Sequence, residues 1–426
     1  MPIIEITAMT FGPYGIGHHD GKTVMVPGAV PGDRVEVEII SQRRGYSLGK
    51  ITQVLEASPQ RRIAPCPFLP RCGGCDWQQI NYEAQLRIKA DLIARELERS
   101  IGIELDRANL IEPAPAEYGY RSRIRLQAGA NGELGYFEAG SNNLVAIDRC
   151  IVAESAIRIP NALARALGRR FEEIEVIRSG ENEQVLVPYL KKPADSRDIT
   201  NARRILQSDP TIAGIVLRGG DDRIVLGDAR TNIELEPGLA IEVDADLFSQ
   251  VNRALNQSLV REVMRMAELN GDFSTTPQRE RLSVLDLFCG AGNFALPAAR
   301  RGASVTGVDS DAPAIAAASQ NATRLKFATT QFIAMKAAEV AQFLHRARYR
   351  PKTVILDPPR TGALQLMQLV VKLRPDRIIY VSCDVTTLAR DLRELRAGGY
   401  EIDRVRAFDF FPNTHHAEVA ARAVLT

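Results

Sequence analysis

The sequence predicts an α/β fold, with a doubly wound domain at its C-terminal end behind a small β-barrel and a central domain of mixed helices and strands. From about residue 241 onward, apolar strands alternate with helices, which is the pattern of a mostly parallel sheet. The first 60 or so residues are instead short β-rich runs separated by Gly and Pro. A chain of 426 residues is also too long for one ordinary core. We therefore expect domains at 1–60, 61–240 and 241–426.

The composition is that of a globular protein with nearly balanced charge. Lys and Arg number 54 against 52 Asp and Glu, for a net charge of +2. Any nucleic-acid binding must therefore depend on local patches rather than on the overall charge. The sequence has no secretory signal pattern and no run of about 18 apolar residues that could span a membrane. We expect a cytoplasmic monomer without a membrane partner.

In the first domain, the runs "IIEITAMT", "TVMVPGAVPGDRVEVEII" and "YSLGKITQVLEA" predict short strands that close into a barrel. Basic side chains gather towards its end, with a tyrosine among them: Arg43, Arg44, Tyr46, Lys50, Arg61 and Arg62. A solvated face and an RNA contact explain this stretch equally well.

The central domain opens with a helix expected over 82–103, because Tyr82, Ile93 and Leu97 fall near one stripe at helical spacing. We expect this helix to pack on the C-terminal domain. A second helix is expected over 155–174, with strands after it.

Between these helices, "YGYRSRIRLQAGANGELGYFEAG" changes to period two and predicts a hairpin at Asn131-Gly132. Arg121, Arg123 and Arg125 share one face of the first strand. Like charges at this spacing repel each other unless an anion offsets them. We interpret the three arginines as candidates for binding RNA phosphates, with a solvated edge strand as the alternative.

In the last domain, "VLDLFCGAGNF" is an apolar strand that ends at Asp286 and runs into a turn with Gly290 and Gly292 before a helix. Such a turn lets a ligand approach backbone amides at a helix start. The next strand ends at Asp309, where a carboxylate can bind both ribose hydroxyls. The third glycine of the dinucleotide fingerprint is missing, so this pairing favours S-adenosylmethionine over NAD.

Two further strand ends carry reactive groups. "LDPPR" supplies Asp357, two stiffening prolines and Arg360, which is available for an anion or a carboxylate. "YVSCDVTTLARD" places Cys383 between a strand and a helix start, where amide dipoles favour a thiolate. Because strand ends of a parallel sheet meet at one edge, Asp357 and Cys383 are expected in the same crevice.

The last motif, "FDFFPNTHHAEVA", places Phe410 and Phe411 ahead of His415, His416 and Glu418. Aromatic rings, hydrogen-bonding groups and a carboxylate would suit a nucleobase. A metal site is not favoured, because adjacent histidines point in divergent directions and no third ligand is near in sequence.

Together these motifs resemble the RNA 5-methyluridine methyltransferases over almost the whole chain. The matching stretches are "FSQVN", "DLFCGAGNF", "GVD", "LDPPR", "YVSCD...TLARD" and "FPNTHHAE". The resemblance implies an N-terminal TRAM barrel, which is OB-like, a central domain and a Rossmann-like S-adenosylmethionine domain. It also implies the cofactor-contacting positions, which are Gln250, Phe288, Asn293, Asp309 and Asp357.

The chemistry of uracil explains two further residues of the resemblance. Carbon 5 of uracil is a poor nucleophile, so a Cys383 thiolate would add to C6 and make C5 nucleophilic. The resemblance assigns Glu418 as the general base that removes the C5 proton after methylation. Two departures stand out: Asp384 where the family has Asn, beside a cysteine that must ionise, and Met335 with Lys336 where an amide or acid usually contacts the adenine.

Three cysteines, Cys66, Cys72 and Cys75, stand close together and are one ligand short of a tetrahedral site. The resemblance to the ribosomal-RNA branch of the family implies Cys150 as a fourth ligand and a 4Fe-4S cluster. Zinc suits four thiolates as well, and a disulfide is disfavoured in a reducing compartment. Because methyl transfer needs no electrons, we expect the cluster to be structural.

The expected substrate is a uridine in structured RNA, with 23S ribosomal RNA preferred and the transfer-RNA T-loop as the alternative. Two hypotheses from other classes stay open. One is an iron-sulfur redox protein that uses the methyltransferase fold as a scaffold, and the other is an RNA-binding protein with an inactive site. The first predicts that Cys383 is dispensable, and the second predicts RNA binding without a covalent adduct with 5-fluorouridine RNA.

Overall fold

The computed structural model describes residues 1–269, 282–336, 339–340, 344 and 349–426. Its N-terminal part is a sheet of six strands in the order β1-β5-β6-β4-β3-β2. These are β1 (Ile3–Glu5), β2 (Ala8–Met9), β3 (Tyr14–His19), β4 (Lys22–Pro27), β5 (Arg34–Gln42) and β6 (Tyr46–Glu56). Strand β1 also contacts β3, so the sheet curls over its own apolar core.

The cysteine-rich segment, residues 62–80, follows the barrel with little regular structure. Its Trp77 is fully buried, and the indole Nε1 donates a hydrogen bond to the carbonyl of Gly12 at 3.1 Å. Trp77, the only tryptophan of the chain, therefore joins the barrel to the cysteine-rich segment. Helix α1 (Tyr82–Ile101) begins directly after this segment, capped by the Asn81 side chain.

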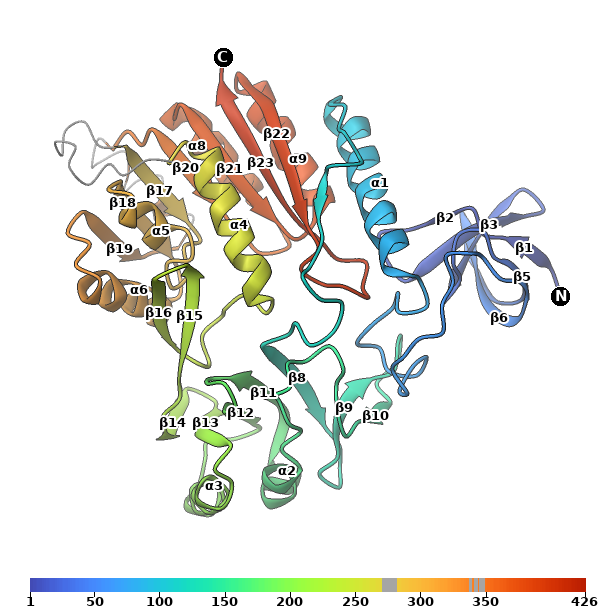
Figure 1. The fold of residues 1–426 in the computed structure, drawn as a ribbon, viewed down its shortest axis with the longest axis horizontal. Coiled ribbons are helices and arrows are strands. Elements are labelled where there is room, and N and C mark those ends of the chain that lie inside the picture. Colours follow the sequence, from blue (N-terminus) through green and yellow to red (C-terminus); the bar gives the residue numbers. More distant parts are fainter. Residues whose placement is uncertain (270–281, 337–338, 341–343, 345–348) are drawn as a thin grey trace.

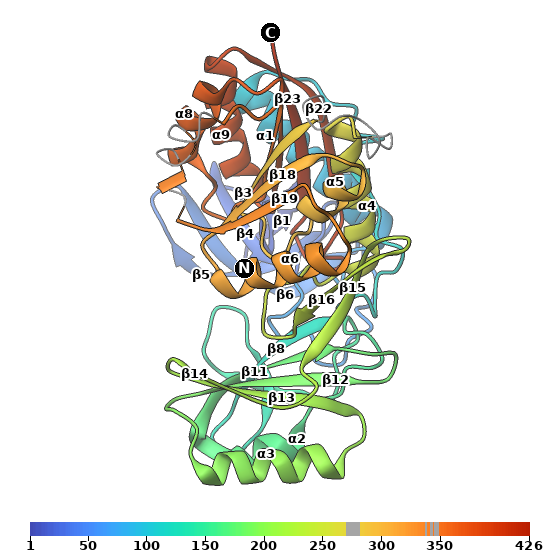
Figure 2. The same cartoon turned by 90° about the vertical axis from the view of Figure 1, so that its left-hand side faces the viewer.

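The central sheet has seven strands in the order β10-β9-β8-β11-β12-β13-β14. These are β8 (Arg123–Ala128), β9 (Leu134–Phe137), β10 (Leu144–Ala146), β11 (Phe171–Arg178), β12 (Gln184–Leu190), β13 (Ile212–Gly219) and β14 (Asp222–Gly227). Helices α2 (Asn161–Leu167) and α3 (Ser196–Ser208) cover the face that points away from the C-terminal domain (Figure 2).

The helix expected over 155–174 was wrong at both ends. Pro160, which has no amide hydrogen, stands just before α2, and Gly168 ends it with a φ of 57°. Phe171 then begins a strand that pairs with both β8 and β12. Pairing with these two strands makes the segment a strand rather than a helix, in agreement with its Ile and Val residues, which favour β-structure.

The C-terminal sheet has eight strands in the order β19-β18-β17-β20-β21-β23-β22-β7. These are β7 (Ile111–Glu112), β17 (Ser283–Leu287), β18 (Ser304–Asp309), β19 (Thr330–Ala334), β20 (Thr353–Leu356), β21 (Arg377–Ser382), β22 (Tyr400–Phe408) and β23 (Glu418–Leu425). Strands β17 to β21 run parallel, and β23 is antiparallel to β21. The predicted doubly wound α/β fold is confirmed.

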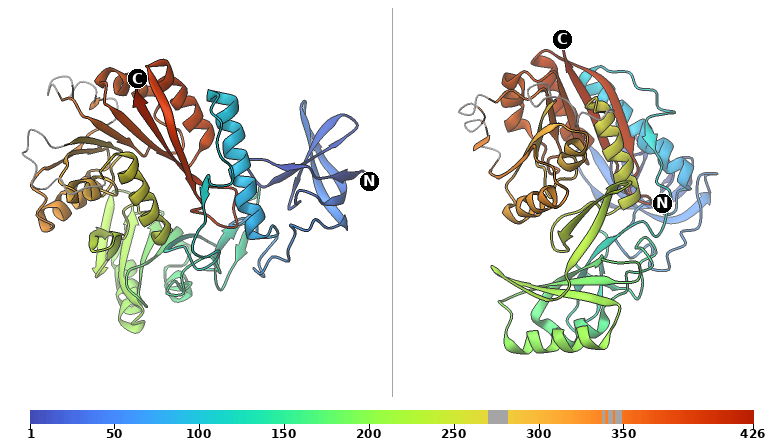
Figure 3. Two further views of the ribbon diagram at one scale, coloured as in Figure 1. Left: turned by 45° about the horizontal axis from the view of Figure 1, so that its top comes forward. Right: turned by 60° about the vertical axis from the view of Figure 1, so that its left-hand side comes forward.

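Helices cover both faces of this sheet (Figure 1). They are α4 (Arg253–Met266), α5 (Ala295–Arg300), α6 (Ala312–Arg324), α8 (Leu364–Leu373) and α9 (Val385–Ala397). Helix α1 joins the same core as α8 and α9 through Ile93 and Leu97, and it stands between the sheet and the barrel (Figure 3).

The hairpin of β15 (Arg230–Glu236) and β16 (Leu239–Asp244) links the central sheet to the C-terminal one. Its apolar side chains share a core with Leu296 and Ala317, so the expected limit at residue 240 falls inside β16. Over the described ranges, no helix is long and apolar enough to cross a membrane.

Candidate active site

A cavity of about 640 Å³ lies at the carboxyl ends of the parallel strands, beside the β15–β16 hairpin. Its volume is in the range of small-molecule sites, about 300–1,000 Å³. The structure brings together around it all seven residues that the sequence placed in the cofactor site and the catalytic site: Gln250, Phe288, Asn293, Asp309, Asp357, Cys383 and Glu418.

The turn after β17 leaves backbone exposed to this cavity. Phe288, Gly290 and Gly292 all have positive φ, at 64°, 51° and 97°, a conformation that costs little only for glycine. A Cβ added at Gly292 would lie 2.8 Å from the Leu296 side chain. Asp309 Oδ2 accepts a hydrogen bond from Gly290 N at 2.9 Å, so the turn and the carboxylate are held together. This open backbone fits a nucleoside ligand.

Asn293 is oriented by a residue that the sequence analysis missed. Its Nδ2 donates to Asn256 Oδ1 at 3.1 Å, and Asn256 Nδ2 donates to Asn293 Oδ1 at 2.8 Å. Asn256 lies on α4, one turn after the "FSQVN" motif, and it also lines the cavity. The position of Asn256, one helical turn after this motif, was the feature of the sequence that could have identified it.

The Cys383 thiol stands where β21 ends and α9 begins. Burial, with a smaller contribution from Glu418, raises its pKa to about 11, while the Arg360 guanidinium acts in the opposite direction. Asp384 caps α9, accepting from Thr387 N through Oδ1 at 2.8 Å. Among the carboxylates, Glu418 makes the larger contribution to the raised pKa of Cys383 and Asp357 the smaller.

Asp357 and Glu418 line the cavity, and Asp286 is fully buried near the end of β17. Burial raises the pKa of Glu418 well above its usual range, with a further contribution from Asp357. Burial also raises the pKa of Asp357 to about 7 and that of Asp286 well above its usual value. These acids favour their neutral forms before substrates bind.

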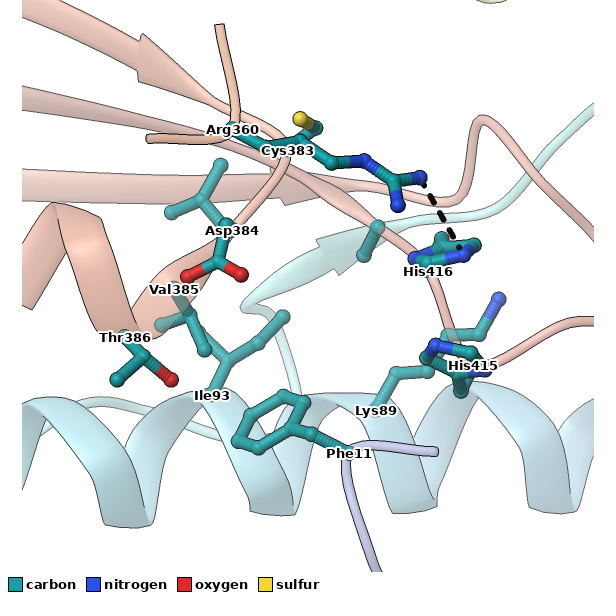
Figure 4. A pocket seen from close by; sticks show the side chains of 12 residues that line it. Phe11, Lys89, Ile93, Arg360, Cys383, Asp384, Val385, Thr386, His415 and His416 are labelled. Atoms are coloured by element: carbon teal, nitrogen blue, oxygen red, sulfur yellow. Dashed lines mark hydrogen bonds between the residues drawn. The ribbon is translucent and has the colours of Figure 1, made fainter. Parts of the chain in front are cut away.

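His416 faces Arg360 across the mouth of the site (Figure 4), with Nε2 at 3.5 Å from the Arg360 Nη2 atom. Burial, with contributions from His415 and Arg360, lowers the pKa of His416 to about 4. A neutral ring can accept this hydrogen bond from the guanidinium. Arg360 is therefore the cation that faces both Cys383 and Glu418.

The four cysteines expected to bind a cluster, Cys66, Cys72, Cys75 and Cys150, line one cavity together with Arg121 and Tyr136. All six cysteines of the chain are free thiols. Nevertheless, among the described residues no group of three or more His, Cys, Asp or Glu side chains is arranged to hold a metal ion. The four thiols thus share a cavity.

The cysteine-rich segment is bound directly to the loop 411–416 that precedes Glu418. Asp76 N and Trp77 N donate to the carbonyl of Asn413 at 3.2 and 3.0 Å. The His415 Nδ1 atom lies 2.5 Å from Asp76 Oδ2. Two elements far apart in the sequence therefore position each other.

The three arginines of β8 and the residues just before it have partners within the protein. Arg123 binds the carbonyls of Ala245 and Leu247 and lies 3.5 Å from Glu175. Arg125 pairs with Glu173, and the Arg121 guanidinium lies 5.6 Å from the centre of the Phe411 ring. Protein carboxylates on β11 offset Arg123 and Arg125, so phosphate is not needed to balance their charges. RNA binding by the three arginines stays a prediction.

Met335 packs against the core and Lys336 is exposed. Neither lines the large cavity.

Comparisons with known proteins agree with this site. Residues 81–422 match the family described as tRNA (Uracil-5-)-methyltransferase, and residues 4–52 match the TRAM domain. A 23S rRNA (uracil(1939)-C(5))-methyltransferase of Pectobacterium atrosepticum is 32% identical, over 98% of this chain and 93% of the relative. An uncharacterized RNA methyltransferase of Thermotoga maritima is 30% identical, over 99% of this chain and 98% of the relative.

Among solved structures, the tRNA (uracil-54, C5)-methyltransferase of Pyrococcus abyssi in complex with S-adenosyl-L-homocysteine superposes with a TM-score of 0.75. It covers 99% of this chain and 100% of its own at 24% identity, which supports the fold. With its matched family, its TRAM domain and relatives of 30% identity or more along nearly its whole length, the chain belongs to the S-adenosylmethionine-dependent RNA uracil-C5 methyltransferases.

Proposed function

We propose that this protein methylates C5 of a uridine in structured RNA, with 23S ribosomal RNA as its substrate. The observation that carries the proposal is the single cavity that unites Cys383, Glu418 and the five cofactor positions. The RNA is inferred from relatives that match the whole chain and are named for 23S rRNA. All six cysteines are free thiols, which suits a reducing cytoplasm.

Cys383 is the proposed nucleophile. Its thiol must first lose a proton, and Arg360 is the cation that favours the thiolate. The sulfur then forms a bond to C6 of uracil, and the electrons of the C5–C6 double bond make C5 nucleophilic. C5 forms a bond to the methyl group of the substrate S-adenosylmethionine, the S–CH3 bond breaks with its electrons on sulfur, and S-adenosylhomocysteine leaves.

Glu418 is the proposed general base. After methylation, C5 carries both the methyl group and a proton. When a carboxylate takes this proton, the electrons of the C5–H bond restore the C5–C6 double bond and expel the Cys383 thiolate. Because burial raises the pKa of Glu418, a carboxylate there is a strong base for this step once it is ionised.

We propose that different residues contact different parts of S-adenosylmethionine. Asp309 would bind the ribose hydroxyls, and the open turn at Gly290 and Gly292 admits the ligand next to backbone. Gln250, Phe288, Asn293 and Asp357 line the remaining wall.

Cys66, Cys72, Cys75 and Cys150 are proposed to hold a 4Fe-4S cluster with a structural role. Four thiolates suit a zinc ion or a 4Fe-4S cluster, and these four line one cavity. The resemblance to the ribosomal-RNA branch of the family favours the cluster. The bonds from Asp76 and Trp77 to Asn413 are the route by which it would support the catalytic loop.

The decisive experiment is to trap a covalent adduct between the enzyme and RNA that contains 5-fluorouridine. Fluorine at C5 cannot leave as a proton, so the Cys383–C6 bond would persist. We expect mass spectrometry to map the adduct to Cys383 and to one nucleotide of 23S rRNA. An adduct on transfer RNA alone would move the substrate to the T-loop alternative, and no adduct would support the redox or inactive-site hypotheses.

A further inference from the structure

A second cavity, of about 200 Å³, also reaches Cys383. Separate parts of the chain build it, among them Phe11 from the barrel, Ile93 from α1, and Asp384 at the start of α9 (Figure 4). It shares Arg360, Cys383 and His416 with the larger cavity. Whatever base reacts at Cys383 therefore lies next to this second space.

We propose that the second cavity binds the base of the nucleotide adjacent to the target uridine, and that Phe11 and Asp384 recognise it. The proposal rests on the methyltransferase function given above. A base that forms a bond with Cys383 is joined by one phosphodiester to each neighbour, and the second cavity begins at that same thiol. The barrel would thus read the RNA beside the modified base.

Phe11 provides the stacking surface. It is a large apolar side chain that is 41% exposed, and its ring borders the cavity beside Ile93 (Figure 4). Nucleobases stack on such aromatic rings regardless of sequence. A base stacked on this ring would cover its exposed part.

Asp384 provides the selectivity. Its carboxylate projects among the side chains that line the cavity (Figure 4). Among the described residues, only its Oδ1 atom accepts a hydrogen bond, from Thr387 N, which leaves Oδ2 for a ligand. A carboxylate accepts from the exocyclic amino group of a base. Adenine, cytosine and guanine carry one, and uracil does not.

The charges around the cavity suit a nucleotide. Lys89 also borders it, but its ammonium is paired with Asp409. Arg360 is exposed and makes its contact with the neutral His416. Its guanidinium therefore stands between the two cavities, where the phosphate that links two adjacent nucleotides would pass.

The first test uses a 23S rRNA fragment centred on the uridine that the relatives' name specifies, made with 5-fluorouridine there and an abasic residue on either side. We expect Phe11→Ala to weaken binding of the intact fragment roughly tenfold, the effect of losing one base–aromatic stack. The abasic residue at one of the two positions should cause the same loss, with no further loss when both changes are combined.

The control is Ile63→Ala, which shortens a 94% exposed side chain that does not line the cavity. It should leave RNA binding unchanged, and both variants should retain their affinity for S-adenosylhomocysteine, which checks folding. If the losses of RNA affinity from Phe11→Ala and from the abasic residue instead multiply when the two changes are combined, the proposal is overturned. An absence of adduct with the wild-type enzyme would instead defeat the proposed function itself.

The second test is Asp384→Asn, which keeps a side chain that caps α9 equally well. The wild-type enzyme should bind fragments with an amino-bearing neighbour about tenfold more tightly than those with uracil. In the variant this preference should disappear, because the amide oxygen caps Thr387 N and the remaining NH2 group can only donate, so it cannot accept from an amino group. A preference that persists would show that another group reads this base and would remove Asp384 from the proposal.

Discussion

The two cysteine sites of this protein place the same side chain in opposite settings. Cys383 shares the large cavity with one other cysteine, Cys289. The charged groups that act on the Cys383 thiol are Arg360, Glu418 and Asp357. The four thiols of the other cavity face one another, with Arg121 beside them. A single thiol with one cation suits transient ionisation and attack, whereas four thiols that face each other need a cationic group to hold their charge.

The two sites are also connected. The cysteine-rich segment bonds to Asn413 and His415, and Arg121 lies over Phe411. Both contacts end on the loop that leads to Glu418. Changes at one site should therefore separate into effects on chemistry at Cys383 and effects on the position of this loop.

Cys383→Ala should have the largest effect and separates the two cysteine sites most clearly. We expect it to abolish methyl transfer and the 5-fluorouridine adduct, because no other group can add to C6. Binding of S-adenosylmethionine, measured by calorimetry, should persist. Cys289→Ala removes the other thiol of the cavity, which turns towards Gly290 O, and should still form the adduct. Turnover by Cys383→Ala would contradict the mechanism.

Glu418→Gln should have the next largest effect. The amide cannot accept the C5 proton, so turnover should fall by about 10²–10⁴-fold while Cys383 still adds to C6. Ordinary uridine RNA should then accumulate as a methylated covalent complex, detected as a band of reduced mobility in a denaturing gel. A fall in turnover without this complex would argue that Glu418 acts before methylation.

Cys75→Ala tests the other cysteine site. Loss of one ligand should release the cluster, seen as loss of its visible absorption, and should weaken folding or RNA binding rather than the chemistry alone. The effect on methyl transfer should follow the fraction of folded, RNA-binding protein. A cluster-free protein that folds and binds RNA but no longer transfers methyl groups would overturn the structural role.

The sequence predicted the parts of the fold and site that local pattern determines. Apolar strands with glycine or a carboxylate at their ends place Asp309, Asp357 and Cys383 at one sheet edge, because parallel strands end together. The family and the enzyme class, inferred from ordered motifs, are confirmed.

What the sequence did not predict depends on partners far away in the chain. The sequence pattern indicated the arginines as candidates for binding phosphate. The carboxylates that offset Arg123 and Arg125 come from β11, about 50 residues later in the chain. Phe11 gave no signal as a neighbour of Cys383, because only the packing of the barrel on α1 brings it there. Long-range burial, unlike periodicity, leaves no local trace.

The pH dependence of adduct formation sharpens the contrast in charge. Burial and Glu418 raise the pKa of Cys383 to about 11, and only the thiolate reacts, so the rate should rise about tenfold per pH unit between pH 7 and 9. Arg360→Gln removes the cation that lowers this pKa and should slow the reaction at each pH, while Arg360→Lys should retain part of the rate. A plateau below pH 8 would contradict the high pKa.

The smallest expected effect tests the connection between the two sites. Asp76→Asn replaces a charge-assisted hydrogen bond to His415 with a neutral one and should cost about 1 kcal/mol of unfolding free energy, together with a few-fold loss in the rate of adduct formation. Asp20→Asn is the matched control, because Asp20 lies 3.4 Å from His19 in an exposed pair and such pairs contribute little. In a double-mutant cycle with His415→Gln, the two losses should not add, since both remove one contact. Full additivity would mean that Asp76 and His415 act independently, and the cysteine-rich segment would then reach the catalytic loop through Asn413 alone.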